Sequence, residues 1–215
     1  MLDRVFRYLL PGYCLGCGRE GEMVCDRCVE GVVGHESYSA EPLHKALWIY
    51  DNSRIHAKLI KAWKYQFQKT AFLYIAPALI QFAETNKDWL CGIDAIVPIP
   101  LHSRREAERG FNQAEVIAKE LGRISGIPSC AWLRRTQKTA SQASLGRNAR
   151  AKNMQGVFAF EKNMCVDGVS CLLVDDVYTT GATMHEAAGV LMMAGVRRVK
   201  FFTLCKDELQ RGERV

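Results

Sequence analysis

The chain has 215 residues, of which 48% are hydrophobic and 24% charged, a composition that suits one ordinary globular domain with a small appendage and excludes extensive disorder. Its formal net charge of +6 favours phosphate-bearing ligands or a nucleic-acid backbone without choosing between them. No stretch reaches the roughly 18 to 20 apolar residues that a membrane span needs. The N-terminus also carries no small-residue cleavage site typical of a signal peptide. We therefore expect a cytoplasmic protein with no transmembrane segment.

The N-terminal part is predicted to form a short helix followed by a metal-binding module. Apolar residues recur at helical spacing within residues 2–10. Behind them, four cysteines follow the pattern C-x2-C-x7-C-x2-C, namely Cys14, Cys17, Cys25 and Cys28. Two such turns place four thiolates for tetrahedral coordination, so we expect a closed, structural Zn2+ site. The alternative is two redox pairs or plain reduced cysteines, although a redox motif would follow a strand and open a helix.

Strands and helices alternate after this module. A linker leads to a strand at Ala46–Tyr50, a helix begins near Ile55, and a second helix contains Pro77 as its start or as a kink. The β-branched run "IDAIVPIP" predicts a buried parallel strand that ends in a loop. Asn112 and Glu115 then form an Asn-x-x-Glu capping box ahead of a further helix.

The second half of the chain continues this alternation, which argues for an α/β sheet. The expected elements are strands at about 130–134, 157–160, 169–174 and 199–205, and a helix at about 180–194. Five cysteines in the body of the chain are isolated, mostly among apolar neighbours, and we expect them to act as small core residues. They are Cys91, Cys130, Cys165, Cys171 and Cys205.

One stretch, "CLLVDDVYTTGATMHEA" over residues 171–187, carries the chemistry. A buried strand is expected to end at Asp175 and Asp176, and a glycine-containing turn leads to a helix N-terminus around Thr180 to Thr183. Ligands of open parallel sheets bind at such strand ends, and the backbone N–H groups and dipole of the helix favour a phosphate. The carboxylates would repel that phosphate, so they must meet sugar hydroxyls, a divalent cation or both.

Other schemes fit this stretch less well. The Walker string G-x-x-x-x-G-K-[ST] does not occur in the chain. A glycosidase pair needs carboxyl groups several ångströms apart across a bond, whereas neighbours on one strand project to opposite faces. The alternative is that the Asp-Asp and Thr-Thr-Gly residues only form an ordinary turn, for which these residue types are common, and bind no ligand.

The string "LLVDDVYTTGAT" resembles the phosphoribosyl pyrophosphate motif of type I phosphoribosyltransferases, in which two acidic residues at a strand end precede a small-residue phosphate loop. The stretches "VPIPLHSRREAERGFNQAEVIAKEL" and "RRTQKTASQASLGRNARAKNMQGVFAF" resemble the ComF/GntX group of bacterial competence-associated proteins, which also carry an N-terminal four-cysteine module. The resemblance implies a type I phosphoribosyltransferase fold, with a mostly parallel central sheet flanked by helices. Residues 1–38 would form the N-terminal helix and zinc module, and residues 39–215 the α/β domain.

The resemblance also implies roles for single residues. Asp175 and Asp176 would bind the ribose 2′- and 3′-hydroxyls of phosphoribosyl pyrophosphate. The loop that would hold its 5′-phosphate consists of Thr179, Thr180, Gly181, Ala182 and Thr183. Family members bind the pyrophosphate with Mg2+ at a loop after an earlier strand, here Pro98 to Arg105.

A flexible basic hood closes over the site in the family, and residues 134–152 are its candidate here. This segment has no acidic residue, which is unusual for a balanced solvated surface. Its basic residues are Arg134, Arg135, Lys138, Arg147, Arg150 and Lys152. We expect Lys138 and Arg147, together with Arg104 and Arg105, to bind the phosphates of the ligand, and closure of the hood to exclude water from the reactive sugar.

Two positions depart from the usual motif. Several purine-salvage members carry an aspartate where this chain has Thr179, and that aspartate serves as a base near the purine ring, so its absence argues against purine salvage. Tyr178 replaces an aliphatic residue, and we expect it to pack beneath the loop. The family's usual chemistry is displacement of pyrophosphate from C1 of the ribose by a nitrogen nucleophile, through an oxocarbenium-like state. Binding of phosphoribosyl pyrophosphate with Mg2+ is therefore the main prediction, with transfer as its consequence.

A second hypothesis is a single-stranded DNA-binding competence factor that uses the phosphoribosyl pyrophosphate site as a regulatory pocket. Basic residues around Arg109 and in the segment 134–152 could hold a nucleic-acid backbone as well as pyrophosphate. Trp132 would either stack on bases or pack in a strand. The ComF resemblance also implies a role with DNA taken up during natural transformation. A scaffold that recruits a DNA-uptake helicase, and a homodimer, are further hypotheses.

Overall fold

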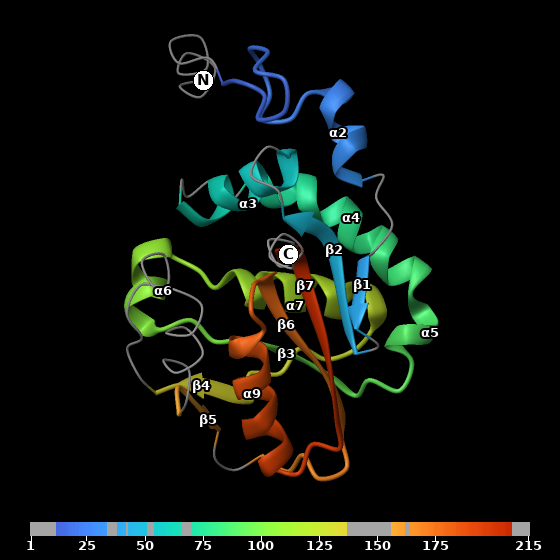
Figure 1. The fold of residues 1–215 in the computed structure, drawn as a ribbon, viewed down its shortest axis with the longest axis vertical. Helices are drawn as coiled ribbons and strands as arrows, with labels where there is room; N and C mark the ends of the chain where they lie inside the picture. Colours follow the sequence, from blue (N-terminus) through green and yellow to red (C-terminus); the bar gives the residue numbers. More distant parts are fainter. Residues whose placement is uncertain are drawn as a thin grey trace, which may run out of the picture.

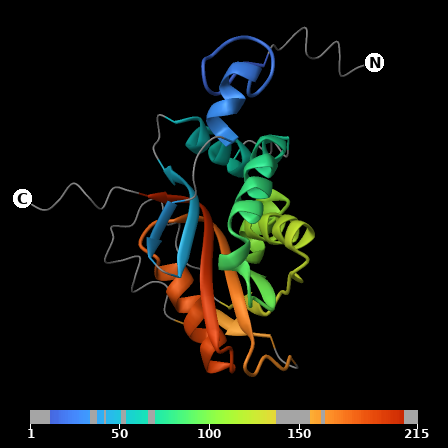
Figure 2. The ribbon, with the colours of Figure 1, turned by 90° about the vertical axis from the view of Figure 1, so that its right-hand side faces the viewer.

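The computed structural model describes residues 12–33, 38–41, 43–50, 54–65, 70–136, 156–161 and 164–207. Helices lie on both faces of a central sheet, and the cysteine-containing segment caps one end of the long axis (Figures 1 and 2). Within these residues, no helix is both long enough and apolar enough to cross a membrane.

The central sheet has five strands in the order β1-β2-β7-β6-β3. These strands are β1 (Tyr38–Glu41), β2 (His44–Tyr50), β7 (Arg198–Asp207), β6 (Ser170–Tyr178) and β3 (Ala95–Pro98). β1 pairs antiparallel with β2, and the remaining neighbours are parallel. The predicted mostly parallel sheet is confirmed. β1 lies in a stretch that was expected to be a linker, because its short sequence "YSAE" has no strand-like alternation.

Four helices pack on one face of this sheet, and one covers the other face (Figure 2). The first group is α3 (Ile55–Tyr65), α4 (Ala71–Thr85), α5 (Lys87–Leu90) and α7 (Gln113–Ser125), and the opposite helix is α9 (Ala182–Met193). β6 serves both faces, with Leu172 and Val174 packed toward the first group and Cys171 and Leu173 toward α9. Burial on both sides explains why this strand reads as a continuous apolar run.

Local sequence signals set the ends of several helices. The Asn112 side chain accepts a hydrogen bond from the Ala114 N–H, as expected of an N-cap, and its Nδ2 donates to the Ile99 carbonyl over 2.9 Å. This second bond ties α7 to the loop that follows β3. Pro77 lies inside α4, so it does not start that helix.

The strands predicted near 130–134 and 157–160 form a separate antiparallel ribbon of β4 (Leu133–Arg135) and β5 (Phe158–Phe160). The ribbon packs beside α9, as Figure 1 shows. Trp132 precedes it and is only 7% exposed, within the core on the α9 side. Of the two alternatives for Trp132, packing is therefore the one observed.

The N-terminal module is joined to the main core through α2 (Asp26–Val33). Val24 and Val32 are buried in the same cluster as the helices of the first face, and the Trp48 indole N–H donates to the Val32 carbonyl over 3.2 Å. Of the five isolated cysteines, Cys171 and Cys205 are core residues as expected and Cys130 is half-buried beside the core, whereas Cys91 and Cys165 are exposed. Both exposed cysteines lie close to turns, where an apolar neighbourhood in the sequence does not imply burial.

Candidate functional site

The two adjacent aspartates lie within β6, which was expected to end before them. The register with β7 continues from Asp175 opposite Thr203 to Tyr178 opposite Lys206. Successive side chains of a strand point to opposite faces. Asp176 accordingly meets α3 on one face, and Asp175 interacts with β4 on the other.

Asp176 forms an ion pair with Lys64 in the last turn of α3. The Lys64 Nζ lies 2.8 Å from Asp176 Oδ2, and the two side chains are 15% and 13% exposed. The buried thiol of Cys205 lies close enough for both charges to affect its pKa, which burial raises strongly. Asp176 is therefore a largely buried carboxylate with a cation of the same chain beside it.

Asp175 interacts with a different cation, Arg135, which lies near Arg105. Burial and the neighbouring Asp176 raise the pKa of Asp175 to about 7, against the opposing effects of the Asp176 N–H, Lys64 and Arg135. Burial and the nearby Arg105 lower the pKa of Arg135, and Asp175 raises it, so these three side chains share one electrostatic environment. Arg105 comes from α6 (Ser103–Arg109), a helix within the loop predicted after β3.

The predicted phosphate loop connects β6 directly to α9. Thr179 and Thr180 follow the strand, Gly181 caps the helix, and Ala182 and Thr183 form its first turn. The Thr180 hydroxyl accepts a hydrogen bond from the Ala182 N–H at 3.4 Å. The loop therefore lies at the positive end of a twelve-residue helix, a position that stabilises an anion.

Tyr178 packs beneath this loop, as its buried position shows. Its ring lies 4.2 Å from that of His44, and its hydroxyl is 3.4 Å from His185 Nε2. Gly181 has φ 75°, and a Cβ there would overlap the Tyr178 hydroxyl. Both the left-handed backbone and the close tyrosine therefore require glycine at this position.

The four cations that were expected to bind the phosphates do not all lie at the site. Arg104 points along α6 to Glu108 in a surface ion pair, with 74% of its side chain exposed, whereas Arg105 is turned toward Arg135. Lys138 and Arg147 lie outside the described residues, as does most of the segment 134–152. Of the two described cations expected to bind the phosphates, Arg105 lies near Arg135, which interacts with Asp175.

The four cysteines of the N-terminal module are close together. Their Sγ atoms all lie within 4.8 Å of one another, and those of Cys17 and Cys25 are 3.7 Å apart. Tetrahedral Zn–S bonds of about 2.3 Å would separate neighbouring sulfurs by about 3.8 Å. Burial alone would raise the pKa of Cys14, yet backbone N–H groups of Cys17, Cys25 and Gly16 lower it to about 6 by stabilising the thiolate. The donor set fits Zn2+.

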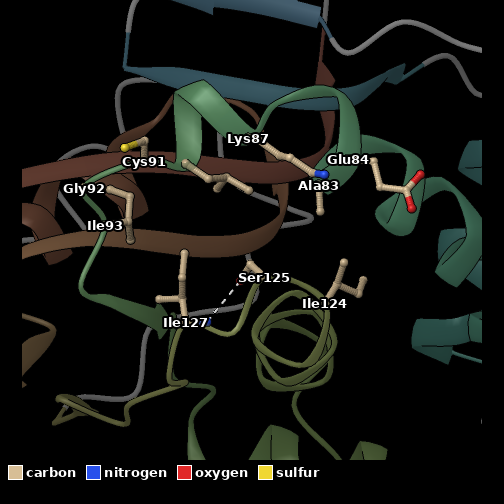
Figure 3. A pocket seen from close by; sticks show the side chains of 10 residues that line it. Ala83, Glu84, Lys87, Cys91, Gly92, Ile93, Ile124, Ser125 and Ile127 are labelled. Carbon is tan, nitrogen blue, oxygen red and sulfur yellow. Dashed lines mark hydrogen bonds between the residues drawn. The ribbon is translucent and has the colours of Figure 1, made fainter.

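A separate hollow of about 480 Å³ lies at the opposite end of β3, between the ends of α4 and α7 (Figure 3). Ser125 lines it and accepts a hydrogen bond from the Ile127 N–H, while Lys87 extends toward Ala83. Ile93, which lines the hollow, comes just before β3, so the hollow lies at the amino end of that strand. It is therefore separate from the site at the carboxyl ends of the strands.

Two residues of the site were not predicted in these roles. Lys64 belongs to no motif, and it reaches Asp176 only because α3 packs across the end of the sheet. Arg135 was counted with the basic hood, but it lies on β4 next to Asp175. No local signal identifies Lys64, whereas the lack of acidic residues around Arg135 already indicated an anion-binding neighbourhood.

A family model described as phosphoribosyl transferase domain matches residues 107–215. "DNA utilization protein YhgH" of Salmonella typhi is 38% identical over 117 residues, which are 53% of this chain and 49% of that protein. "Competence protein ComFC" of Bacillus subtilis is 38% identical over 114 residues, 52% of this chain and 44% of that protein. The chain thus spans about half the length of the curated relatives it matches.

Among solved structures, adenine phosphoribosyltransferase from Leishmania tarentolae has a TM-score of 0.46 at 12% identity, over 80% of this chain and 94% of that one.

Zinc analysis tests the cysteine cluster. We expect about one equivalent of Zn2+ per chain, lost in Cys14→Ser and in Cys25→Ser, because a closed site needs all four thiolates. Cys165→Ser, at an exposed cysteine outside the cluster, is the matched control and should retain the metal. Metal-free protein with two disulfides by mass spectrometry would instead support the redox alternative.

The raised pKa of Asp175 predicts a pH-dependent effect of Asp175→Asn on stability. The folded protein binds this proton more tightly than the unfolded chain does, so wild-type stability falls as pH rises from about 4 to about 7. The variant lacks this loss, and its free energy of unfolding relative to wild type should rise by about 3 kcal/mol between pH 4.5 and pH 8. Urea titrations measure this, with the exposed Asp88→Asn as control. An equal difference at both pH values would contradict the prediction.

Proposed function

The chain belongs to the phosphoribosyl transferase domain family and to its competence-related ComF group, and on that premise we propose that it binds phosphoribosyl pyrophosphate with Mg2+. One observation carries the proposal. Two carboxylates near the end of β6 precede the predicted phosphate loop at the N-terminus of α9, with Arg135 close to the first of them and Arg105 close to Arg135.

In this proposal the sugar and its phosphate are bound by different parts of the β6–α9 connection. Asp175 and Asp176 accept hydrogen bonds from the ribose hydroxyls. Hydroxyl groups can donate to carboxylates, whereas a phosphate would be repelled by them. The loop from Thr179 to Thr183 binds the 5′-phosphate with backbone N–H groups and threonine hydroxyls. The distance between strand end and helix start is fixed by Gly181, which allows the close turn.

The pyrophosphate would lie toward the loop after β3, with Arg105, Arg135 and the basic segment as its cations. Among the described residues, the four cysteines are the only group of three or more potential metal ligands. Mg2+ would therefore be held mainly by oxygens of the ligand and by water, as Mg2+ often is in phosphate sites. When bound, it would offset the charge of the pyrophosphate.

Transfer would follow the usual chemistry of the family. A nitrogen nucleophile forms the bond to C1 while the bond from C1 to pyrophosphate breaks, and pyrophosphate leaves with the electron pair. Arg105 and Arg135 are placed to stabilise that developing charge. Thr179 offers no carboxylate to serve as a base beside a purine, so the acceptor we favour is not a salvaged purine base.

The zinc module would have a structural role. Zn2+ on Cys14, Cys17, Cys25 and Cys28 would link the turn at Gly16 to the start of α2. A Cβ at Gly16 would come within 2.7 Å of Cys28 Sγ and 3.1 Å of the Ile55 side chain, so the turn packs directly on α3. The module therefore supports the helix that carries Lys64.

Calorimetric titration of Mg2+ and phosphoribosyl pyrophosphate into the zinc-loaded protein tests the proposal. We expect saturable binding, weakened at least about 100-fold by Asp175→Asn/Asp176→Asn, because two charge-assisted hydrogen bonds are removed. Asp88→Asn, on α5 at the other end of the molecule, is the control. Wild-type protein that is folded and zinc-loaded but does not bind would rule the proposal out. Pyrophosphate release across a panel of amine and nucleobase acceptors then tests transfer.

A second candidate function is binding of single-stranded DNA, favoured by relatives whose names refer to DNA utilization and competence. Arg134 on β4 is half exposed, next to a basic segment without acidic residues, and can contribute to a phosphate-binding surface. We expect the affinity for an oligothymidine to fall steeply with salt concentration, and the slope to decrease in Arg147→Ala/Arg150→Ala. A flat salt response would exclude this function.

A further inference from the structure

The ion pair of Lys64 and Asp176 differs from the other ion pairs of the described residues. In those pairs the cations are exposed by 49% to 74% and lie on the surface of helices or of β4. Lys64 is 15% exposed and Asp176 13%, at 2.8 Å. Surface pairs contribute little, but losing one partner of a largely buried pair leaves a charge without compensation.

The last turns of α3, which carry Lys64, are held in the core by the neighbouring Trp63. Trp63 is 1% exposed, and its ring lies 5.2 Å from that of Phe72 and 5.7 Å from that of Phe111. Phe111 precedes α7, whose N-cap Asn112 is bonded to the loop after β3. α3 is thus packed against the same loop region in which the pyrophosphate is proposed to bind.

The hydrogen bonds of the two aspartates leave a defined pair of acceptors. Asp175 Oδ1 accepts the Asp176 N–H at 2.8 Å, and Asp176 Oδ2 is occupied by Lys64. Among the described residues, no other hydrogen-bond or ion-pair partner reaches either carboxylate. One oxygen of each, Asp175 Oδ2 and Asp176 Oδ1, has no such partner among these residues, and in the proposed site each accepts one ribose hydroxyl.

We propose that Lys64 is a positioning residue of the phosphoribosyl site: it fixes Asp176 through Oδ2, so that Oδ1 meets a ribose hydroxyl. This inference rests on the proposed function. Without the ammonium, Asp176 loses its orientation and its counter-charge, and the site holds two adjacent negative charges beside a ligand rich in phosphate. Arg135 remains on the other face and opposes only Asp175 directly.

The same geometry predicts a preference for ribose over deoxyribose. A ligand without the 2′-hydroxyl leaves one carboxylate oxygen without a partner in a largely buried position, and unpaired buried acceptors are costly. Because Lys64 holds Asp176 in place, the carboxylate cannot rotate to form a hydrogen bond with water, and the cost of the unpaired acceptor remains. Loss of Lys64 should therefore lower both affinity and discrimination.

Calorimetry with Mg2+ and phosphoribosyl pyrophosphate on the full, zinc-loaded chain tests the role of Lys64. We expect Lys64→Met to bind about 10-fold more weakly than wild type and Lys64→Arg to recover most of the loss. Lys58→Met, nearly two turns earlier on α3, is the control. Lys64→Met/Asp176→Asn should bind no more weakly than Asp176→Asn alone, because Lys64 acts through that carboxylate.

A pH series separates positioning from a general structural effect. On one face of β6, Asp176 meets Lys64 of α3 and Cys205 of β7. On the other face, Asp175 meets Arg135 of β4, which Arg105 of α6 also influences. Lys64 lowers the pKa of Asp175, so removing it makes that carboxyl harder to ionise. The ratio of variant to wild-type dissociation constants should therefore widen as pH falls from 8 to 6. Lys64→Gln, with zinc content and melting temperature as checks on folding, should show the same trend if Lys64→Met does not fold.

The outcomes distinguish the two proposals. If the wild type does not bind, the proposed function fails and this inference fails with it. If the wild type binds and Lys64→Met binds equally well at every pH, Lys64 has no positioning role while the proposed function stands. Additive losses in the double variant would likewise overturn an action through Asp176.

Discussion

Two carboxylates occupy successive positions near the end of β6, and the cations that oppose their charge come from both faces of the sheet. Lys64 reaches Asp176 from α3, while Arg135 of β4 interacts with Asp175 and has Arg105 of α6 nearby. Adjacent carboxylates repel each other in a partly buried site, so this arrangement holds only if the helices and the ribbon are packed in place. The layers on the two faces therefore determine the charge state of the site as well as its shape.

The loop proposed to bind phosphate also depends on the packing of side chains beneath it. Tyr178 is buried between His44 and His185, and burial, with the nearby Lys206 and His185, lowers the pKa of His44 to about 4. A neutral, packed histidine supports the tyrosine, and the tyrosine lies against Gly181. The N-terminal cysteine module lies farther from the site, and Gly16 and Val32 pack it against α3 and the main core.

The sequence predicted the central sheet, the helix that begins after Asn112 and the β6–α9 connection, because each has a local signal: a β-branched run, a capping residue, or apolar residues followed by a glycine turn. It did not predict that β6 continues to Tyr178, since two aspartates ordinarily disfavour a strand. Pairing with β7 through Lys206 overrides that preference. Lys64 could not be predicted either, because its contact joins residues far apart in the chain.

A crystal structure of the zinc-loaded protein with Mg2+ and phosphoribosyl pyrophosphate tests the central claim most directly. The account predicts ribose hydroxyls on Asp175 and Asp176, the 5′-phosphate on the loop from Thr179 to Thr183, and Lys64 still paired with Asp176. A ligand bound elsewhere, with the aspartates and the loop unoccupied at saturating concentration, would contradict it.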